Sequence, residues 1–298
     1  MKILVTGKDG QVVRSLLARA SAHPGLTLIA VGRPELDLAD LRTFEPALAR
    51  YAPDLVVNAA AYTAVDQAED EPETAHAVNA EAPRLLARLT AERGIPLIQI
   101  STDYVFDGAL DRPYEENDTV NPLSAYGKSK LAGEEAVRRE NADHLILRTA
   151  WVYSAHGRNF LKTMLKLAET REELRIVSDQ IGNPTAARDI ADGILTAIDA
   201  RRRRGPEGWS ATYHLAGSGE AGWHEFAAHI FSENAARGGP SARVVPITTA
   251  DYPTKAVRPR NSRLSCERFA TAFGYRAPHW RESVVETLEE LAAADPVR

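Results

Sequence analysis

The sequence of 298 residues contains one cysteine, Cys266, so an internal disulfide is excluded, and no cysteines and histidines have metal-site spacing. No stretch approaches the roughly 18 apolar residues of a membrane span, and the apolar run before Gly7 is too short for a signal peptide. A basic excess is also missing, because 41 acidic residues outnumber 36 basic ones. This balance argues against a dedicated nucleic-acid-binding protein. We therefore expect a cytoplasmic protein that binds neither nucleic acid nor a membrane.

The remaining composition is that of an ordinary globular protein, with 44% hydrophobic and 26% charged residues. The basic run from Arg201 to Arg204 lies between the apolar segment DIADGILTAI and the turn signal GPEG. We interpret this run as the solvated C-terminal end of a helix, where cations suit the helix dipole.

Short β-branched segments alternate with longer amphipathic ones through the first half of the chain, which predicts βαβ units. The expected fold is α/β, a doubly wound parallel sheet of Rossmann-like type with a smaller, loop-rich C-terminal substrate lobe. Strands are predicted near Lys2 to Thr6, Thr27 to Val31, Asp54 to Asn58, Pro96 to Ser101 and His144 to Thr149.

The pattern loosens after about Trp151, where Pro, Gly and aromatic residues cluster. We expect a dinucleotide-binding, Rossmann-like domain over residues 1–150 and a mostly substrate-binding lobe over residues 151–298. A helix and a strand near residues 186–217 are expected to return to the sheet.

Gly7 and Gly10 follow the first predicted strand and precede the first helix. Glycines in this position permit a tight turn and close approach of a pyrophosphate to a helix N-terminus. The second strand ends with Gly32 and Arg33 instead of the acid that often binds a ribose hydroxyl. Because a guanidinium suits a 2′-phosphate, Arg33 favours NADPH over NADH, with an exposed turn residue as the alternative interpretation.

Tyr126 and Lys130 stand four residues apart in the segment SAYGKSKLAGE. Residues four apart share a helix face, so a phenol and an ammonium can meet at one reacting oxygen. Thr102 and Asp103 come where the fourth strand is expected to end, at the sheet edge where ligands of open α/β folds lie. These residues are the candidate catalytic corner.

The glycine turn, together with NAAAYTAVDQAE, STDYVFDG, YGKSKLAGE, RTAWVY, DQIGNPT and RPRNSRL, resembles the extended short-chain dehydrogenase/reductase superfamily. Within that superfamily the chain is most similar to the dTDP-4-dehydrorhamnose reductase family, and the resemblance covers nearly the whole chain. It implies NADPH-dependent reduction of the 4-keto group of dTDP-4-dehydro-L-rhamnose, a step of nucleotide-sugar biosynthesis. The implied partner is a dTDP-linked 4-keto-6-deoxy sugar, and NADH stays open as an alternative cofactor.

The resemblance also implies a role for individual residues. Tyr126 matches the proton donor, and Lys130 matches the lysine that lowers the phenol's pKa and binds the nicotinamide ribose. Thr102 matches the hydroxyl that hydrogen-bonds the reacting oxygen, and with Asp103 it is expected to touch the sugar, near Trp151. The family's cofactor contacts fall at Gly10, Gln11, Val12, Asp37, Leu38, Ala61, Tyr62 and Thr63.

Two other functions stay open. One is a nucleotide-sugar epimerase or 4,6-dehydratase, although dehydratases of the superfamily have a glutamate where Tyr104 follows Asp103. The other is a non-catalytic regulatory relative of the kind that serves methionine adenosyltransferase. The intact set of Thr102, Tyr126 and Lys130 argues against this second alternative.

The remaining expectations concern the oligomeric state, Asn79 and the aromatic residues near the sugar. Some relatives pair through metal-bridged acids near the first helix, but Ser15 and its neighbours offer no acid, so we predict no required metal. A homodimer stays open. Asn79 resembles the superfamily's active-site asparagine, and we favour a structural role for it. The lobe around Trp151 and Trp223 is expected to orient the sugar over the nicotinamide.

Overall fold

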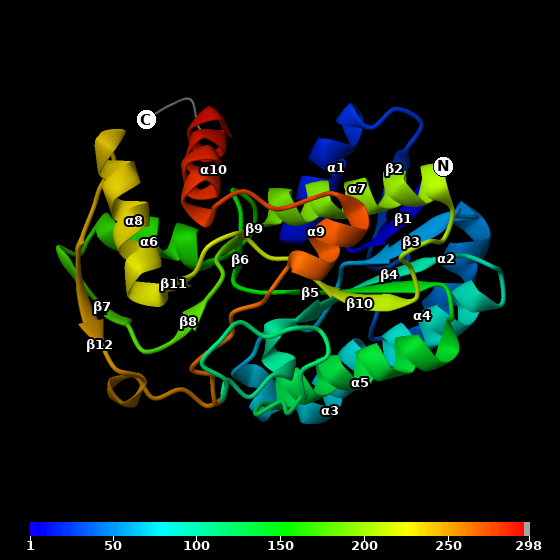
Figure 1. Cartoon of the computed structure of the whole chain (residues 1–298), viewed down its shortest axis with the longest axis horizontal. Coiled ribbons are helices and arrows are strands. Elements are labelled where there is room, and N and C mark those ends of the chain that lie inside the picture. Colours follow the sequence, from blue (N-terminus) through cyan, green and yellow to red (C-terminus); the bar gives the residue numbers. More distant parts are fainter. Residues whose placement is uncertain (295–298) are drawn as a thin grey trace.

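The computed structural model describes residues 1–294, and its centre is a six-stranded sheet with the order β10-β5-β4-β3-β1-β2 (Figure 1). Every neighbouring pair in this sheet is parallel. The strands are β1 (Lys2–Thr6), β2 (Thr27–Val31), β3 (Leu55–Asn58), β4 (Leu97–Thr102), β5 (His144–Thr149) and β10 (Ala211–His214). The predicted doubly wound α/β fold is therefore confirmed, and the five predicted strands agree with the observed ones to within one residue at each end.

Helices cover both faces of this sheet (Figure 1). On one face, Ile3 and Val5 pack in a core with α1 (Gln11–Arg19) and α7 (Ala187–Arg204). On the other face, Leu4 packs in a core that draws on α2 (Phe44–Tyr51), α4 (Ala82–Ala91) and α5 (Ala125–Glu140). This alternation is what the two-residue period of a strand requires when both faces are buried.

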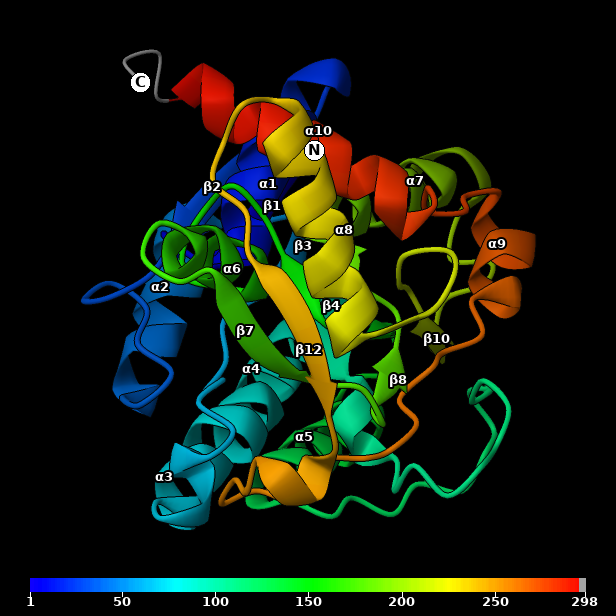
Figure 2. The same ribbon diagram turned by 90° about the vertical axis from the view of Figure 1, so that its left-hand side faces the viewer.

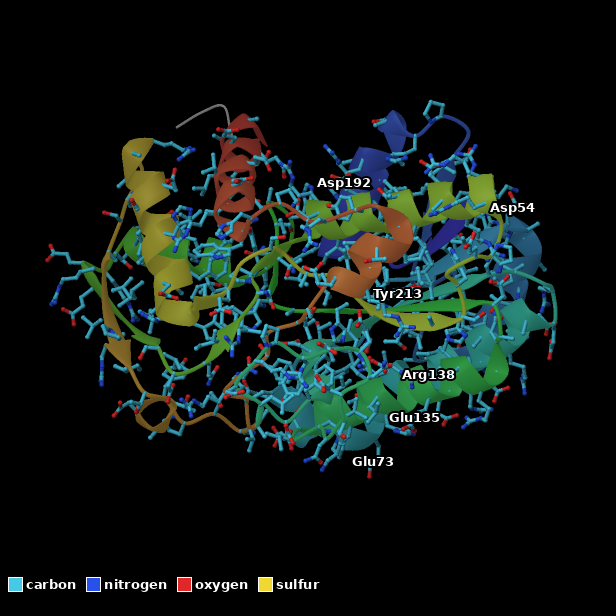
Figure 3. All side chains as sticks on the ribbon, in the orientation of Figure 1. Asp54, Glu73, Glu135, Arg138, Asp192 and Tyr213 are labelled. Atoms are coloured by element: carbon cyan, nitrogen blue, oxygen red, sulfur yellow. The ribbon has the colours of Figure 1, made fainter. Side chains whose placement is uncertain are left out.

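Charged side chains occupy the outward sides of these helices. Glu73, on α3 (Pro72–His76), and Glu135, on α5, are exposed and point away from the sheet (Figure 3). No helix within residues 1–294 is both long and apolar enough to cross a membrane.

The segments after β5, apart from α7, β10 and α9 (Glu267–Phe273), form a second group of elements with its own core. In this group β7 and β12 pair in parallel, and α6 and α8 pack together beside them (Figure 2). Its members are β6 (Val152–Tyr153), α6 (Phe160–Ala168), β7 (Glu173–Val177), β8 (Ile181–Gly182), β9 (Thr185–Ala186), β11 (Ala221–Gly222), α8 (Trp223–Ala236), β12 (Arg243–Ile247) and α10 (Trp280–Ala294). The buried residues of α9, Phe269 and Phe273, pack instead in the core that contains α1 and α7.

The division into domains at residue 150 stays a prediction. Residues 295–298 of the expected C-terminal lobe lie outside the described residues.

Candidate active site

A cavity of about 630 Å³ lies where β1, β2 and β3 end. Gly7 shapes its floor, because it has φ +96°, a conformation that favours glycine, and its N–H donates to the carbonyl oxygen of Val31 at 2.7 Å. Seven residues predicted to contact a cofactor line this cavity together: Gly7, Gly10, Arg33, Asp37, Leu38, Ala61 and Tyr62.

The N-terminus of α1 faces the same turn. Gly10 is its N-cap, no side chain caps the helix, and its first turn contains no acid. The free N–H groups and the positive end of the helix dipole therefore suit an anion such as a pyrophosphate.

Five predicted cofactor contacts are not among the residues that line the cavity: Gln11, Val12, Thr63 and the pair Tyr126 and Lys130, which lies at the end of β4. The Gln11 amide oxygen accepts hydrogen bonds from Ser154 Oγ at 3.0 Å and Asn159 Nδ2 at 2.9 Å, so this side chain is turned toward the later segment. Val12 packs into the core beneath α1, and Thr63 is exposed beyond the cavity.

Lys8 is a lining residue that the sequence argument missed. Its Nζ donates to the carbonyl oxygen of Arg33 at 3.3 Å and lies 3.5 Å from a carboxylate oxygen of Glu35. Lys8 and Arg33 therefore both line the cavity near the end of β2, and Lys8 has Glu35 as an anionic neighbour. The signal was present in the sequence, since Lys8 lies between the two glycines. The other lining residues that were not predicted are Asp9, Leu36, Ala39 and Val78.

Helix α5 brings the predicted catalytic pair to the end of β4. Ser124 begins the helix by accepting a hydrogen bond from the Gly127 N–H at 3.1 Å. A Cβ added at Gly127 would lie 2.3 Å from the carbonyl oxygen of Tyr104, so this glycine lets α5 approach the chain just after β4. Tyr126 and Lys130 are both buried on the inner side of the helix.

The polar groups around this pair are well defined. Thr102 Oγ1 donates to Asp103 Oδ1 at 2.9 Å and accepts from the Tyr104 N–H at 3.2 Å. Lys130 Nζ donates to the carbonyl oxygen of Ile100 at 2.7 Å. Thr102, Tyr126 and Lys130 are thus gathered at one strand end, as the sequence argument expects of a catalytic corner.

Burial dominates the electrostatics of the corner. It raises the pKa of Tyr126 to about 12, against a smaller lowering by the hydrogen bond with Thr102. It lowers the pKa of Lys130 to about 8, with the Glu134 carboxylate acting in the opposite direction. Burial also raises the pKa of Asp103 to about 7. The lowering of the Tyr126 pKa expected from Lys130 is therefore opposed by desolvation of the phenol.

Asn79 connects the cofactor cavity to α5. Its amide oxygen accepts from the Tyr62 N–H at 2.9 Å, and its Nδ2 donates to the Tyr62 carbonyl oxygen and to Ser129 Oγ, each at 3.0 Å. Tyr62 lines the cavity and also packs against the cluster that contains Tyr126. The structural role that we favour for Asn79 is therefore to join the Tyr62 backbone to α5 through these hydrogen bonds.

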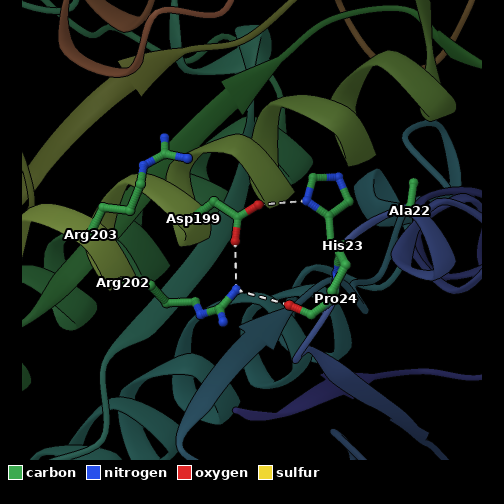
Figure 4. Close-up of a pocket in the computed structure, with 6 residues that line it drawn as sticks. All are labelled: Ala22, His23, Pro24, Asp199, Arg202 and Arg203. Carbon is green, nitrogen blue, oxygen red and sulfur yellow. Dashed lines mark hydrogen bonds and ion pairs between the residues drawn. The ribbon is translucent and has the colours of Figure 1, made fainter.

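A smaller cavity, of about 340 Å³, lies at the opposite edge of the sheet, between the end of α7 and the turn before β2 (Figure 4). There Asp199 bridges His23, at 2.6 Å, and Arg202, at 2.9 Å. Arg201 pairs with Asp143 at 2.6 Å. The basic run is thus the end of a helix with protein partners, and we assign no ligand to this edge, since open α/β folds bind ligands at the carboxyl ends of their strands.

A family model described as the RmlD substrate binding domain matches residues 1–293. The chain belongs to this family. Its RmlD relatives include a dTDP-4-dehydrorhamnose reductase from Sinorhizobium fredii, 47% identical over 283 residues that cover 95% of either chain.

Two solved structures resemble this RmlD chain along nearly its whole length. The crystal structure of a dTDP-4-dehydrorhamnose reductase from Clostridium acetobutylicum has a TM-score of 0.90 and 37% identity, covering 98% of this chain and 99% of that one. A dTDP-4-dehydrorhamnose reductase from Bacillus anthracis, in complex with NADP, has a TM-score of 0.87 and 31% identity, covering 97% and 99%.

Proposed function

We propose that the protein is a dTDP-4-dehydrorhamnose reductase, which reduces the 4-keto group of dTDP-4-dehydro-L-rhamnose to give dTDP-L-rhamnose. The observation that carries this proposal is the meeting of Thr102, Tyr126 and Lys130 beside a cavity with a glycine turn. The names of the relatives, and the NADP bound by one of them, support the same reaction and cofactor.

The residues of the cavity fit a nicotinamide dinucleotide. Gly7 and Gly10 leave room for a pyrophosphate at the uncapped N-terminus of α1, whose N–H groups bind it. Lys8 and Arg33 stand where a 2′-phosphate on the adenosine ribose would meet positive charge, so they favour NADPH. Ala61 and Tyr62 continue the binding surface toward Tyr126.

In the proposed reaction the Tyr126 hydroxyl donates its proton to the carbonyl oxygen of the sugar. NADPH, when bound, supplies the hydride for the carbonyl carbon. Because burial raises the pKa of Tyr126, the phenol stays protonated at neutral pH, as a proton donor must. Thr102 holds the reacting oxygen beside this hydroxyl. The Lys130 ammonium stabilises the phenolate that the proton transfer leaves behind.

The surroundings of Tyr104 argue against the dehydratase alternative. Elimination of water needs an additional acid, and Tyr104 stands at the position where dehydratases of the superfamily have a glutamate. Its ring lies edge-on to Tyr126, with centroids 5.7 Å apart, and burial raises its pKa. A phenol held in its neutral form in this way is a weak acid for a leaving hydroxyl.

The test is NADPH oxidation by the purified chain with dTDP-4-dehydro-L-rhamnose, compared with a panel of other dTDP- and UDP-linked 4-keto sugars. We expect stoichiometric cofactor oxidation with the first sugar and a product that has gained two hydrogens by mass spectrometry. No oxidation with any keto sugar would contradict the proposal and favour the regulatory alternative. Cytoplasmic location, a homodimer and the lack of a required metal stay predictions.

A further inference from the structure

Trp151 has an unusual backbone conformation and a closely stacked ring, and ordinary core packing requires neither. Its φ is +46°, in the left-handed region that is unusual for a bulky residue. Its indole stacks on that of Trp223, with ring centroids 3.5 Å apart and planes inclined by 6°. Its Nε1 donates to Ser262 Oγ at 3.1 Å. Strained conformations persist where the surroundings enforce them, and they concentrate at functional sites.

The groups that hold Trp151 come from one small ribbon centred on β8. On one side, β8 pairs antiparallel with β11, which ends directly before Trp223. On its other side, the Ile181 N–H donates to the carbonyl oxygen of Arg260 at 2.9 Å, and the Ser262 N–H donates to the Ile181 carbonyl oxygen at 2.8 Å. Three segments that are distant in sequence thereby meet at one indole.

Gly182 supplies the third wall of this cradle. A Cβ added there would lie 2.5 Å from Cε2 of Trp151 and 2.7 Å from Ser262 Oγ. The backbone of Gly182 does not have a positive φ, so the close approach of the indole is what calls for glycine at this position. The DQIGNPT segment therefore has a physical role, since its glycine admits the edge of Trp151.

The cradle is anchored on one side and adjoins the catalytic corner on the other. Trp223 packs against Phe160, with centroids 4.7 Å apart, and both belong to the periphery of the second core. Ser262 also lies close enough to Asp103 to lower the pKa of that carboxyl, which burial raises to about 7. Ser262 therefore connects Trp151 with Asp103, which accepts a hydrogen bond from the Thr102 hydroxyl.

We propose that Gly182, Trp223 and Ser262 are positioning residues, which fix the Trp151 indole in one orientation against the bound sugar. This inference rests on the proposed function, because it takes Trp151 as a sugar contact. Trp223 stacks on one face of the indole, and Ser262 accepts a hydrogen bond from the indole nitrogen. Gly182 lets the edge of the indole lie close to the β8 backbone.

The primary test is Gly182→Ala, because the added methyl group would meet both the Trp151 indole and Ser262 Oγ and so must disturb the cradle itself. We expect the KM for dTDP-4-dehydro-L-rhamnose to rise about 2- to 10-fold, the range for loss of one aromatic contact, with an unchanged Kd for NADPH. Trp223→Ala should have a similar effect, and Trp223→Phe should restore part of the loss because a phenyl ring still stacks. Trp209→Phe is the matched control, since Trp209 lies just before β10, packs against the guanidinium of Arg201 and belongs to a different core from Trp223.

A double-mutant cycle separates positioning from general structure. If Trp223 acts through Trp151, Trp223→Ala should add little to the KM of Trp151→Ala. Additive effects, or a normal KM in Gly182→Ala and Trp223→Ala while Trp151→Ala is impaired, would overturn the inference and leave the reductase assignment intact. A normal KM in Trp151→Ala would also overturn it. Failure of the wild-type protein to reduce the sugar would instead refute the proposed function on which it rests.

Discussion

Asp103→Asn should change how the stability of the protein depends on pH. The Asp103 side chain is 2% exposed, its Oδ1 accepts from Thr102, and its Oδ2 has no hydrogen-bond partner among residues 1–294. Burial raises its pKa from 3.8 to about 7, so between these values the folded state holds a proton that the unfolded chain releases. Stability contributed by this carboxyl is full below pH 3.8 and is lost as pH rises toward 7.

The magnitude follows from the same pKa difference. About three pH units at about 1.4 kcal/mol each give a loss of about 4 kcal/mol between pH 4 and pH 7, as an upper limit. Asparagine has no charge to desolvate, but its amide N–H groups at the Oδ2 position lack a partner, which costs about 1–3 kcal/mol at every pH. The variant should therefore be less stable than wild type near pH 4 and more stable near pH 8.

The assay is urea unfolding of both proteins at several pH values from 4 to 8. Asp107→Asn is the control, because the N–H of Ala109 holds the pKa of Asp107 below its usual value and reverses the sign. Asp107→Asn should therefore be less stable than wild type by a nearly constant amount from pH 5 to 8, and this deficit should shrink only as pH falls below 4. A stability difference between Asp103→Asn and wild type that does not change with pH would refute the reasoning, since it would mean that Asp103 is charged throughout.

Three further predictions concern the reaction. Arg33→Ala should raise the KM for NADPH about tenfold and leave that for NADH unchanged, since one exposed charge-assisted contact to the 2′-phosphate is lost; equal cofactor preference in both proteins would make Arg33 a turn residue only. The rate of reduction should decline as pH rises through about 8, where Lys130 loses its proton. A rate that is still undiminished at pH 9 would contradict that role. With dTDP-glucose and catalytic NAD⁺ no loss of water should be seen by mass spectrometry, because Tyr104 replaces the elimination acid, and a dehydrated product would contradict the reductase assignment.

The sheet and the glycine turn were predictable because local chemistry determines them. Strands such as β1 and β5 are short β-branched runs buried on both faces, and Gly7 needs a conformation that few other residues adopt. The position of Thr102 was predictable for a related reason, since parallel strands end at one edge. Its meeting with Tyr126 was expected from the family resemblance.

Other features depend on distant contacts and could not be predicted. Gln11 turns from the cavity because Ser154 and Asn159 bind its amide oxygen, across 143 and 148 residues of sequence. The cradle of Trp151 uses two-residue strands, which are too short to show any periodicity. The raised pKa of Tyr126 also required the structure, because burial outweighs the effect expected from spacing alone.

The most direct test of the central claim is the turnover of Tyr126→Phe with NADPH and dTDP-4-dehydro-L-rhamnose. This substitution removes the hydroxyl that donates the proton and retains the buried ring. We expect kcat to fall by about 10²- to 10⁴-fold, the usual contribution of a positioned acid, while the Kd for NADPH and the thermal midpoint stay at their wild-type values. A kcat close to that of the wild type would contradict the assignment of Tyr126 as the catalytic acid.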